Sequence, residues 1–191
     1  MSKAKEIIKI SLILFLITAI SALLLAFVNE ETAPLIAENS EKKTQEALKG
    51  VMSEAEEFEA VESEFNIEDC TVDRIYKAKD SSGNVIGVCA IIETKGYDSG
   101  LKSAVGVGTD GKVTGVEIIS HKETPGLGAN AEKEEFRSQY IGKSGKISVV
   151  KSNADENEIN AISGATMTSD GVTRSVNGAV EIAEKIIGGE R

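Results

Sequence analysis

The sequence predicts an α+β protein with a single N-terminal transmembrane helix and an extracytoplasmic domain of antiparallel β-hairpins with flanking helices. Three observations support this fold class: an uncharged apolar run near the N-terminus, alternating β-rich segments separated by turn residues, and a helical apolar repeat near the C-terminus. We expect three parts: a cytoplasmic tip and transmembrane anchor over 1–28, a helical stalk or linker over 29–64, and a compact domain over 65–191.

The anchor is predicted from Ile10–Val28, which are 19 residues without a charge. A helix of that length spans about 28 Å, roughly the hydrocarbon thickness of a bilayer. Three lysines precede the run and two glutamates follow it, so the positive-inside rule predicts a single-pass protein of the cell inner or plasma membrane with a cytoplasmic N-terminus. A cleaved signal peptide is the alternative, but its apolar region is usually about 7–15 residues. A buried core helix is disfavoured by the length of the run and by the charged residues at its ends.

Composition excludes several classes of function. The chain has 21 Lys+Arg against 31 Asp+Glu, a net charge of −10, which disfavours a nucleic-acid backbone as the main partner. Two cysteines and one histidine cannot form a zinc site of four cysteines or of two cysteines and two histidines. They cannot form an all-cysteine iron–sulfur site either, so no metal site is predicted.

The compact domain is expected to begin with β-hairpins. The acidic segment 54–65 before it is a surface helix or a loop. Asp110-Gly111 favours a type I′ hairpin turn, in which both central residues need φ > 0. Cys70 and Cys89 lie on opposite arms of the first hairpin, but Cys70 is out of register with Cys89, so we expect free thiols. The four strands are predicted at Cys70–Lys79, Val85–Thr94, Ser103–Gly108 and Val113–Ser120.

The last third of the chain mixes helix and strand. We expect a short helix over Glu132–Ile141, a strand over Lys146–Val150 and a polar loop over 152–160. Apolar residues then recur in steps of three and four from Val172 to Ile187, which predicts a terminal helix. Thr168 or Ser169 can cap the start of that helix, and Gly188-Gly189 ends it.

The first motif that can carry chemistry is Ser163-Gly164-Ala165-Thr166-Met167-Thr168-Ser169, just before the terminal helix. Small residues allow a bulky group to approach the backbone closely. Free N–H groups and the helix dipole favour an anion such as phosphate at that end. The alternative is an ordinary helix start rich in serine and threonine.

The second motif is His121-Lys122-Glu123-Thr124-Pro125-Gly126-Leu127-Gly128, which follows the second hairpin. Pro125 prevents further strand pairing, and the two glycines permit tight turns or contact with a flat ligand. The alternatives are a plain loop with a satisfied surface histidine, or a His/Glu metal pair, which has no third ligand nearby.

HKETPGLG and SGATMTS, about 35 residues apart, together resemble the two signatures of the FMN-binding domain of membrane electron-transfer complexes. With one N-terminal anchor, the chain resembles the family of G subunits of Rnf complexes, which is related to the C subunit of the sodium-translocating NADH:quinone reductase. The resemblance implies a covalent FMN joined by a phosphoester bond to Thr166, which a separate flavin transferase makes. Ser163 and Thr168 would be neighbours of the phosphate.

The same resemblance implies the rest of the cofactor-binding set. Gly164 and Ala165 belong to the motif that carries the flavin. Glu123, Thr124 and Leu127 would contact the isoalloxazine, and Tyr97 is a further candidate. One position departs from the family pattern, because the family usually has Asp where this chain has Asn160. If the transferase reads the carboxylate, modification would be slower.

The resemblance implies an electron-relay subunit of a membrane-bound ferredoxin:NAD+ oxidoreductase coupled to Na+ or H+ transport. Catalysis would belong to the complex, and no catalytic residue is assigned to this chain. The partners would be polytopic and iron–sulfur subunits. Two alternatives are open: a stand-alone membrane-anchored flavoprotein with an external acceptor, and a pilin-like anchored structural or binding protein without flavin. The small residues that the anchor offers to polytopic partners are Ser11, Thr18, Ala19, Ser21 and Ala22.

Overall fold

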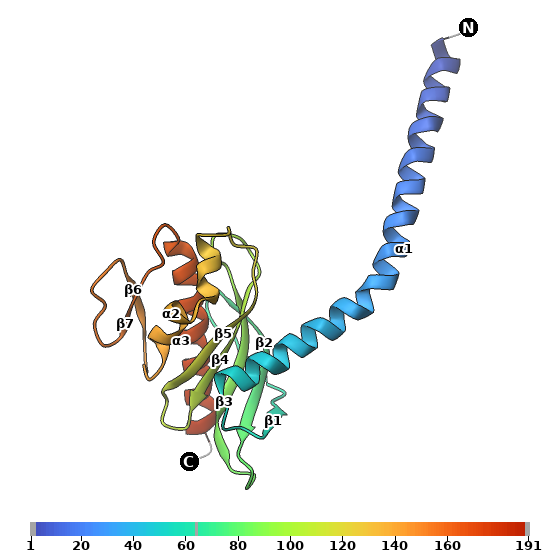
Figure 1. The fold of residues 1–191 in the computed structure, drawn as a ribbon. Coiled ribbons are helices and arrows are strands. Elements are labelled where there is room, and N and C mark those ends of the chain that lie inside the picture. Colours follow the sequence, from blue (N-terminus) through green and yellow to red (C-terminus); the bar gives the residue numbers. More distant parts are fainter. Residues whose placement is uncertain (1–2, 64, 190–191) are drawn as a thin grey trace. The chain divides into compact units, whose positions relative to one another are not determined.

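The computed structural model describes residues 3–63 and 65–189, which divide into two compact units at residues 42 and 43. The elements in chain order are α1 (Lys3–Val51), β1 (Glu57–Ala60), β2 (Cys70–Lys79), β3 (Val85–Thr94), β4 (Leu101–Gly108), β5 (Val113–Ser120), α2 (Glu134–Arg137), β6 (Ser148–Val150), β7 (Glu158–Asn160) and α3 (Thr166–Gly188) (Figure 1). Two short 3₁₀ turns, Gly128–Glu132 and Ser138–Tyr140, flank α2.

The predicted anchor lies within α1, which is long and apolar enough to cross a membrane. Its large apolar side chains from Ile10 to Val28 are exposed in this unit, as expected for a helix whose surroundings would be lipid. The hydroxyl of Thr18 donates to the carbonyl of Phe15, 2.9 Å away, so a polar side chain in the run is satisfied by its own helix. The prediction of an N-terminal apolar helix is confirmed.

The second unit is built on a five-stranded antiparallel sheet with the order β1-β2-β3-β4-β5. Every neighbouring pair of strands is also consecutive in the sequence. The bounds of β2, β3 and β5 are those that the alternation predicts, and β4 begins two residues before the predicted Ser103. The predicted α+β class with antiparallel hairpins is therefore confirmed.

The turn between β4 and β5 differs from the predicted type I′. Gly111 has φ +78°, but Asp110 is not among the residues with positive φ. The N–H of Gly111 donates to the carbonyl of Gly108 at 2.9 Å, and the N–H of Gly108 donates to Lys112 at 2.8 Å. This pattern is a type I turn closed by a glycine bulge, which needs only one residue with positive φ.

The predicted helical stalk over 29–64 is helical only in its first part. Helix α1 ends at Val51, and Glu57–Ala60 form the edge strand β1 rather than a surface helix or loop. Phe58 packs toward the sheet, while Glu57 and Glu59 are exposed. Charged residues on an edge strand oppose pairing with another chain. Glu64, at the end of this predicted segment, lies outside the described residues.

Each face of the sheet has its own core. The last turns of α1, from residue 43 onward, cover one face, where Leu48 is fully buried. Helix α3 covers the other face, against β3 and β4 (Figure 1). Cys89 belongs to the core on the α1 face. Cys70 lies on the α3 face, where its Sγ is 3.6 Å from the carbonyl oxygen of Arg174. Both thiols are free, as predicted, since Cys70 pairs with Thr94 in the ladder.

The segment between β5 and α3 was predicted less well. The expected helix over Glu132–Ile141 is broken into α2 and two 3₁₀ turns, because Lys133 is extended, with φ −71° and ψ 137°. The expected strand is present as β6, but it pairs in parallel with β7, which occupies the end of the predicted polar loop. The predicted single helix and the loop are therefore both wrong in part.

The terminal helix α3 begins at Thr166, two residues before the first of the two predicted capping residues. Ala165 precedes it and has no polar side chain that can cap. The hydroxyl of Thr168 donates to Glu123 instead, and that of Ser169 donates to the carbonyl of Ala165. The predicted side-chain cap is therefore wrong, whereas the helix continues through Gly178 as the periodicity indicates.

Candidate functional site

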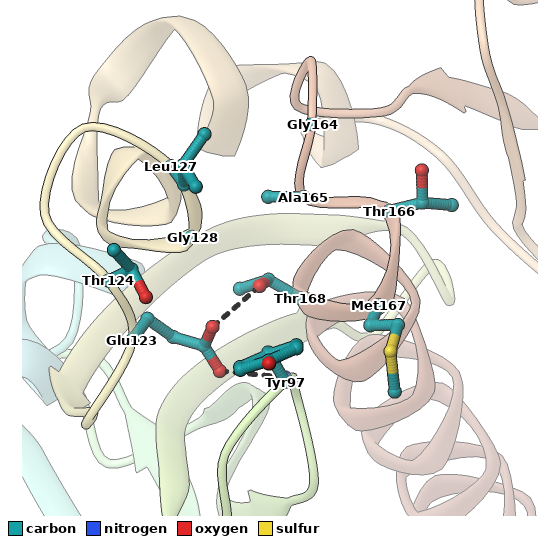
Figure 2. Close-up of a pocket in the computed structure, with 10 residues that line it drawn as sticks. All are labelled: Tyr97, Glu123, Thr124, Leu127, Gly128, Gly164, Ala165, Thr166, Met167 and Thr168. Atoms are coloured by element: carbon teal, nitrogen blue, oxygen red, sulfur yellow. Dashed lines mark hydrogen bonds between the residues drawn. The ribbon is translucent and has the colours of Figure 1, made fainter.

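Three segments that are distant in the sequence surround one cavity of about 550 Å³ (Figure 2). They are the loop after β3, the loop after β5, and the start of α3. This volume lies within the range of roughly 300–1,000 Å³ that is typical of small-molecule sites. The lining residues are Tyr97, Glu123, Thr124, Leu127, Gly128, Gly164, Ala165, Thr166, Met167 and Thr168.

The cavity brings together eight of the nine candidate residues named from the sequence. The ninth, Ser163, lines a neighbouring cavity with Asn130 and Phe136. Gly128 and Met167 were not named as candidates, although both lie inside the two motifs. The motifs themselves were the signal that could have found them.

The start of α3 is suited to an anion. The first hydrogen bond of its first turn runs from the N–H of Ser169 to the carbonyl of Ala165, at 3.1 Å. The N–H groups of Thr166, Met167 and Thr168 precede it, and such groups have no carbonyl partner within a helix. Together with the helix dipole they favour negative charge. Thr166 is exposed, so its hydroxyl is accessible at this position.

Glu123 is the buried carboxylate of the site, with 6% of its surface exposed. Its Oε1 accepts hydrogen bonds from the backbone N–H groups of Tyr97, at 2.9 Å, and Asp98, at 3.3 Å. Its Oε2 accepts the hydroxyl of Thr168 at 2.7 Å. The hydroxyl proton of Thr168 is therefore already used within the protein.

The loop after β5 is ordered by its own hydrogen bonds. The Nδ1 of His121 accepts the N–H of Glu123 at 3.0 Å, so the ring proton lies on Nε2, which is 3.1 Å from the carboxylate of Glu132. The carbonyl of Thr124 accepts the N–H of Leu127 at 3.1 Å. His121 is thus satisfied by the protein. Among the described residues, no group of three or more potential metal ligands is found.

Asn160, the position that departs from the family pattern, lies at the end of β7, six residues before Thr166. Its side-chain Oδ1 accepts the N–H of Ala154 at 3.2 Å, and its own N–H donates to Gln139 at 2.8 Å. The amide oxygen therefore serves as the acceptor that closes the loop from residue 154 to 160. An aspartate could make the same hydrogen bond, because it has an equivalent oxygen.

The rim of the cavity is apolar and open. Tyr97 is 70% exposed, Met167 54% and Leu127 45%, which is high for side chains of this size. Apolar surfaces beside unpartnered N–H groups suit a ligand that has a flat aromatic part and an anionic part. The residues present therefore fit a ligand such as FMN.

Comparisons with known proteins match two families along this chain. Residues 96–181 match the FMN-binding domain family, and residues 1–51 match the RnfG N-terminal region. The cavity residues from Tyr97 to Thr168 all lie within the first match. The protein is therefore of the class that carries an FMN-binding domain after an N-terminal helix.

Relatives over nearly the whole length define the family more narrowly. The G subunit of the proton-translocating ferredoxin:NAD(+) oxidoreductase complex of Clostridium ljungdahlii is 33% identical over 90% of this chain and 88% of its own. The G subunit of the Na(+)-translocating complex of Acetobacterium woodii is 36% identical over 95% of this chain and 94% of its own. The chain belongs to the family of G subunits of the ion-translocating (Rnf) oxidoreductase complexes.

A solved structure confirms the fold. The C subunit of the Na(+)-translocating NADH-quinone reductase of Parabacteroides distasonis superposes with a TM-score of 0.54 and 22% identity, over 78% of this chain and 92% of that one. NqrC of Shewanella oneidensis gives a TM-score of 0.51 and 23% identity, over 73% and 72% of the two chains.

Proposed function

We propose that this chain is the flavin-carrying, electron-transfer subunit of a membrane-bound ferredoxin:NAD+ oxidoreductase that is coupled to Na+ or H+ translocation. The support is the family membership together with the cavity. The relatives from Clostridium ljungdahlii and Acetobacterium woodii are named as subunits of such complexes and match this chain over most of both lengths. The chain thus contributes one electron carrier, and the overall reaction belongs to the complex.

The single observation that carries the proposal is the position of Thr166. Its exposed hydroxyl lies in the first turn of α3, at the wall of the cavity and beside three N–H groups that have no partner in the helix. We infer that this oxygen holds the FMN phosphate in a phosphoester bond. A covalent bond would retain the flavin in a cavity that is open to solvent.

The other cavity residues would hold the ring system and its phosphate. The rim formed by Tyr97, Leu127 and Met167 would pack against the isoalloxazine, and the small Gly164 and Ala165 leave room for the phosphate. When bound, FMN would supply the redox chemistry of an electron carrier. The protein would orient the flavin, limit the access of water to one side of it, and set its potential through nearby charge.

The expected partners follow from the same proposal. The helix α1 would anchor the chain beside polytopic subunits, with the N-terminus in the cytoplasm and the FMN-binding domain on the extracytoplasmic side. Iron–sulfur subunits would exchange electrons with it, and a flavin transferase would attach the FMN. A stand-alone flavoprotein remains the alternative, and co-purification with polytopic subunits separates the two. The pilin-like alternative is disfavoured by the family membership.

The experiment is the intact mass of the full chain purified from its native membrane. Wild-type chain is expected to carry one FMN adduct, and Thr166→Ala is expected to carry none. Ser163→Ala is the matched control, because it removes an exposed hydroxyl three residues away that does not line the cavity. An adduct on Thr166→Ala, or loss of the adduct in Ser163→Ala alone, would contradict the assignment.

A further inference from the structure

Glu123 joins three segments that are far apart in the sequence. It follows β5, while the donors to its carboxylate come from the loop after β3 and from α3, 26 and 45 residues away. We call this group the Glu123 clasp: the carboxylate, the N–H groups of Tyr97 and Asp98, and the hydroxyl of Thr168. All of these donors belong to the chain itself, so the carboxylate is satisfied before any ligand binds.

Two glycines leave space for this carboxylate. A Cβ added at Gly96 would lie 2.3 Å from Oε1 of Glu123. A Cβ added at Gly128 would lie 2.3 Å from Oε2 and 2.6 Å from the hydroxyl of Thr168. Real Cβ atoms do not approach so closely, so any side chain at either position would displace the clasp. The backbone at Gly96 and the backbone at Gly128 therefore both lie directly against the buried side chain of Glu123.

The clasp fixes the direction in which the side chains of the first turn of α3 point. Residues two apart on an α-helix point in directions about 200° apart. Because Thr168 is held inward on Glu123, Thr166 points to the other side of the helix, where it is exposed (Figure 2). The same carboxylate holds the backbone of Tyr97, whose side chain lines the cavity from the opposite segment.

We propose that Glu123 is a positioning residue, which sets the direction of the Thr166 hydroxyl and the separation of the cavity walls through the clasp. The proposal rests on the proposed attachment of FMN to Thr166. It assigns to Glu123 a role that does not require the carboxylate to hydrogen-bond the flavin. The role is tested by how fast Thr166 is modified and by the surroundings of the attached flavin.

The first test breaks the clasp from the side of α3. The full chain is expressed in membranes with the flavin transferase present, and FMN incorporation is followed over time by intact mass. Thr168→Val keeps the shape and removes the hydroxyl, and we expect incorporation to be roughly tenfold slower or more, because misplacing a reacting group by about 1 Å can cost up to about 100-fold. Thr168→Ser keeps the hydroxyl and is expected to restore a rate near that of wild type.

The second test changes Glu123 itself. Glu123→Gln keeps an oxygen for the two N–H groups and can donate its amide to the hydroxyl of Thr168, so we expect incorporation within about threefold of wild type. Glu123→Ala removes the clasp and is expected to slow incorporation at least as much as Thr168→Val. The double variant Glu123→Ala, Thr168→Val is expected to be no slower than Glu123→Ala alone, since both changes remove the same hydrogen bond.

The third test displaces the clasp without changing its polar groups. Gly96→Ala introduces a Cβ against Oε1, whereas Gly188→Ala is the matched control, because nothing lies within 4 Å of the Cβ at that position. We expect slow incorporation in Gly96→Ala and a wild-type rate in Gly188→Ala. The visible circular dichroism of any flavin that is attached should change in the Thr168→Val and Gly96→Ala variants.

Thermal unfolding of each unmodified variant separates positioning from loss of fold. A purely structural role would lower the melting temperature and leave the incorporation rate and the flavin spectrum unchanged in folded protein. Wild-type rates and spectra in folded Thr168→Val would overturn the proposal, and folded Gly96→Ala decides by the same criterion if Thr168→Val does not fold. If wild-type chain acquires no FMN, the proposed function fails, which is a different result.

Discussion

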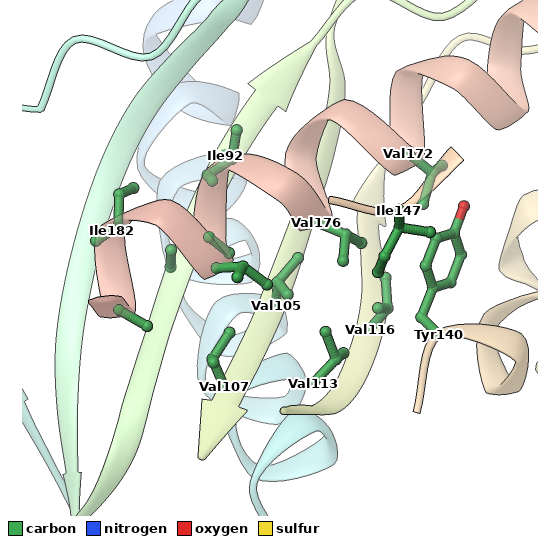
Figure 3. Close-up of a cluster of buried hydrophobic side chains, with 14 of the residues drawn as sticks. Ile92, Val105, Val107, Val113, Val116, Tyr140, Ile147, Val172, Val176 and Ile182 are labelled. Atoms are coloured by element: carbon green, nitrogen blue, oxygen red, sulfur yellow. The ribbon is translucent and has the colours of Figure 1, made fainter. Parts of the chain in front are cut away.

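The two faces of the sheet bury helices in different ways. The last turns of α1 pack on one face with apolar side chains, among them the fully buried Leu48. Helix α3 packs on the other face with valines and isoleucines (Figure 3). It also buries hydroxyl groups in its first half. The buried hydroxyl-bearing residues of α3 are Thr168, Ser169, Thr173 and Ser175.

The polar contacts of the two helices differ as well. On the α1 face, Thr114 donates to the carbonyl of Val51 at 2.7 Å and so binds the last residue of the helix to the sheet. On the α3 face, the hydroxyl contacts of Thr168 and Thr173 reach the loop after β5 and the turn at Tyr140. Apolar packing is enough to hold a helix on a sheet, whereas a functional site at the helix start needs directional bonds that orient it.

The largest expected effect is on the α1 face. Leu48→Ala should lower the free energy of unfolding by about 2–5 kcal/mol, because it removes a fully buried leucine and leaves a cavity. Chemical denaturation of the full chain in detergent measures it. FMN incorporation should stay at the wild-type rate in the folded variant, since Leu48 lies on the face away from the cavity. A slower incorporation rate in the folded variant would contradict the distinction between the two faces.

Alkaline pH should lower the stability of the α1 face through the buried thiol of Cys89. Burial raises the pKa of the Cys89 thiol from an ordinary value of 9.0 to about 12. The unfolded chain loses this proton first, so the stability that the neutral thiol contributes is complete below pH 9 and is lost progressively between pH 9 and 12. Cys89→Ala should make the decline of unfolding free energy with pH shallower by about one proton over that range.

The matched variant for the thiol is Cys70→Ala. Cys70 is only half-buried, whereas Cys89 is fully buried, and burial raises the pKa of the Cys70 thiol as well. Cys70→Ala should therefore change the dependence of the unfolding free energy on alkaline pH less than Cys89→Ala does. Denaturation curves recorded at several pH values measure how the unfolding free energy of each variant depends on pH. Equal pH dependence in wild type and Cys89→Ala would contradict the expectation that the Cys89 thiol causes the loss of stability.

The smallest expected effect is on the α3 face. Tyr140 is fully buried, and its hydroxyl lies 2.8 Å from that of Thr173. Tyr140→Phe should cost about 1 kcal/mol, the typical net value of one hydrogen bond, because Thr173 still donates to the carbonyl of Ser169. Thermal unfolding checks it, and a loss as large as that of Leu48→Ala would contradict the expectation that this hydrogen bond contributes little to stability.

The sequence predicts those strands in which apolar and polar residues alternate, and the helix in which apolar residues recur every three or four positions. Strands β2, β3 and β5 and the body of α3 follow from such patterns. The strand β1 was missed because its glutamates resemble those of a solvated helix or loop, and only pairing with β2 reveals it. The start of α3 was misplaced because the hydroxyl of Thr168 serves a distant carboxylate rather than its own helix.

The site was predicted from two motifs, and the structure brings them to one cavity. What the sequence could not indicate was how Glu123 is used, because its donors at Tyr97 and Thr168 lie 26 and 45 residues away. Ser163 shows that membership of a motif does not place a residue in the cavity. It lies inside the motif, but the backbone turn at Gly164, with φ +75°, places it in a neighbouring cavity.

The most direct test of the central claim is to locate the flavin on the chain. Trypsin should release residues 152–174 as one peptide from protein purified from its native membrane, because no lysine or arginine lies between Lys151 and Arg174. Fragmentation of that peptide is predicted to place a single FMN, through its phosphate, on Thr166. An FMN on Ser163 or Thr168, or an unmodified peptide from membranes that contain the transferase, would contradict it.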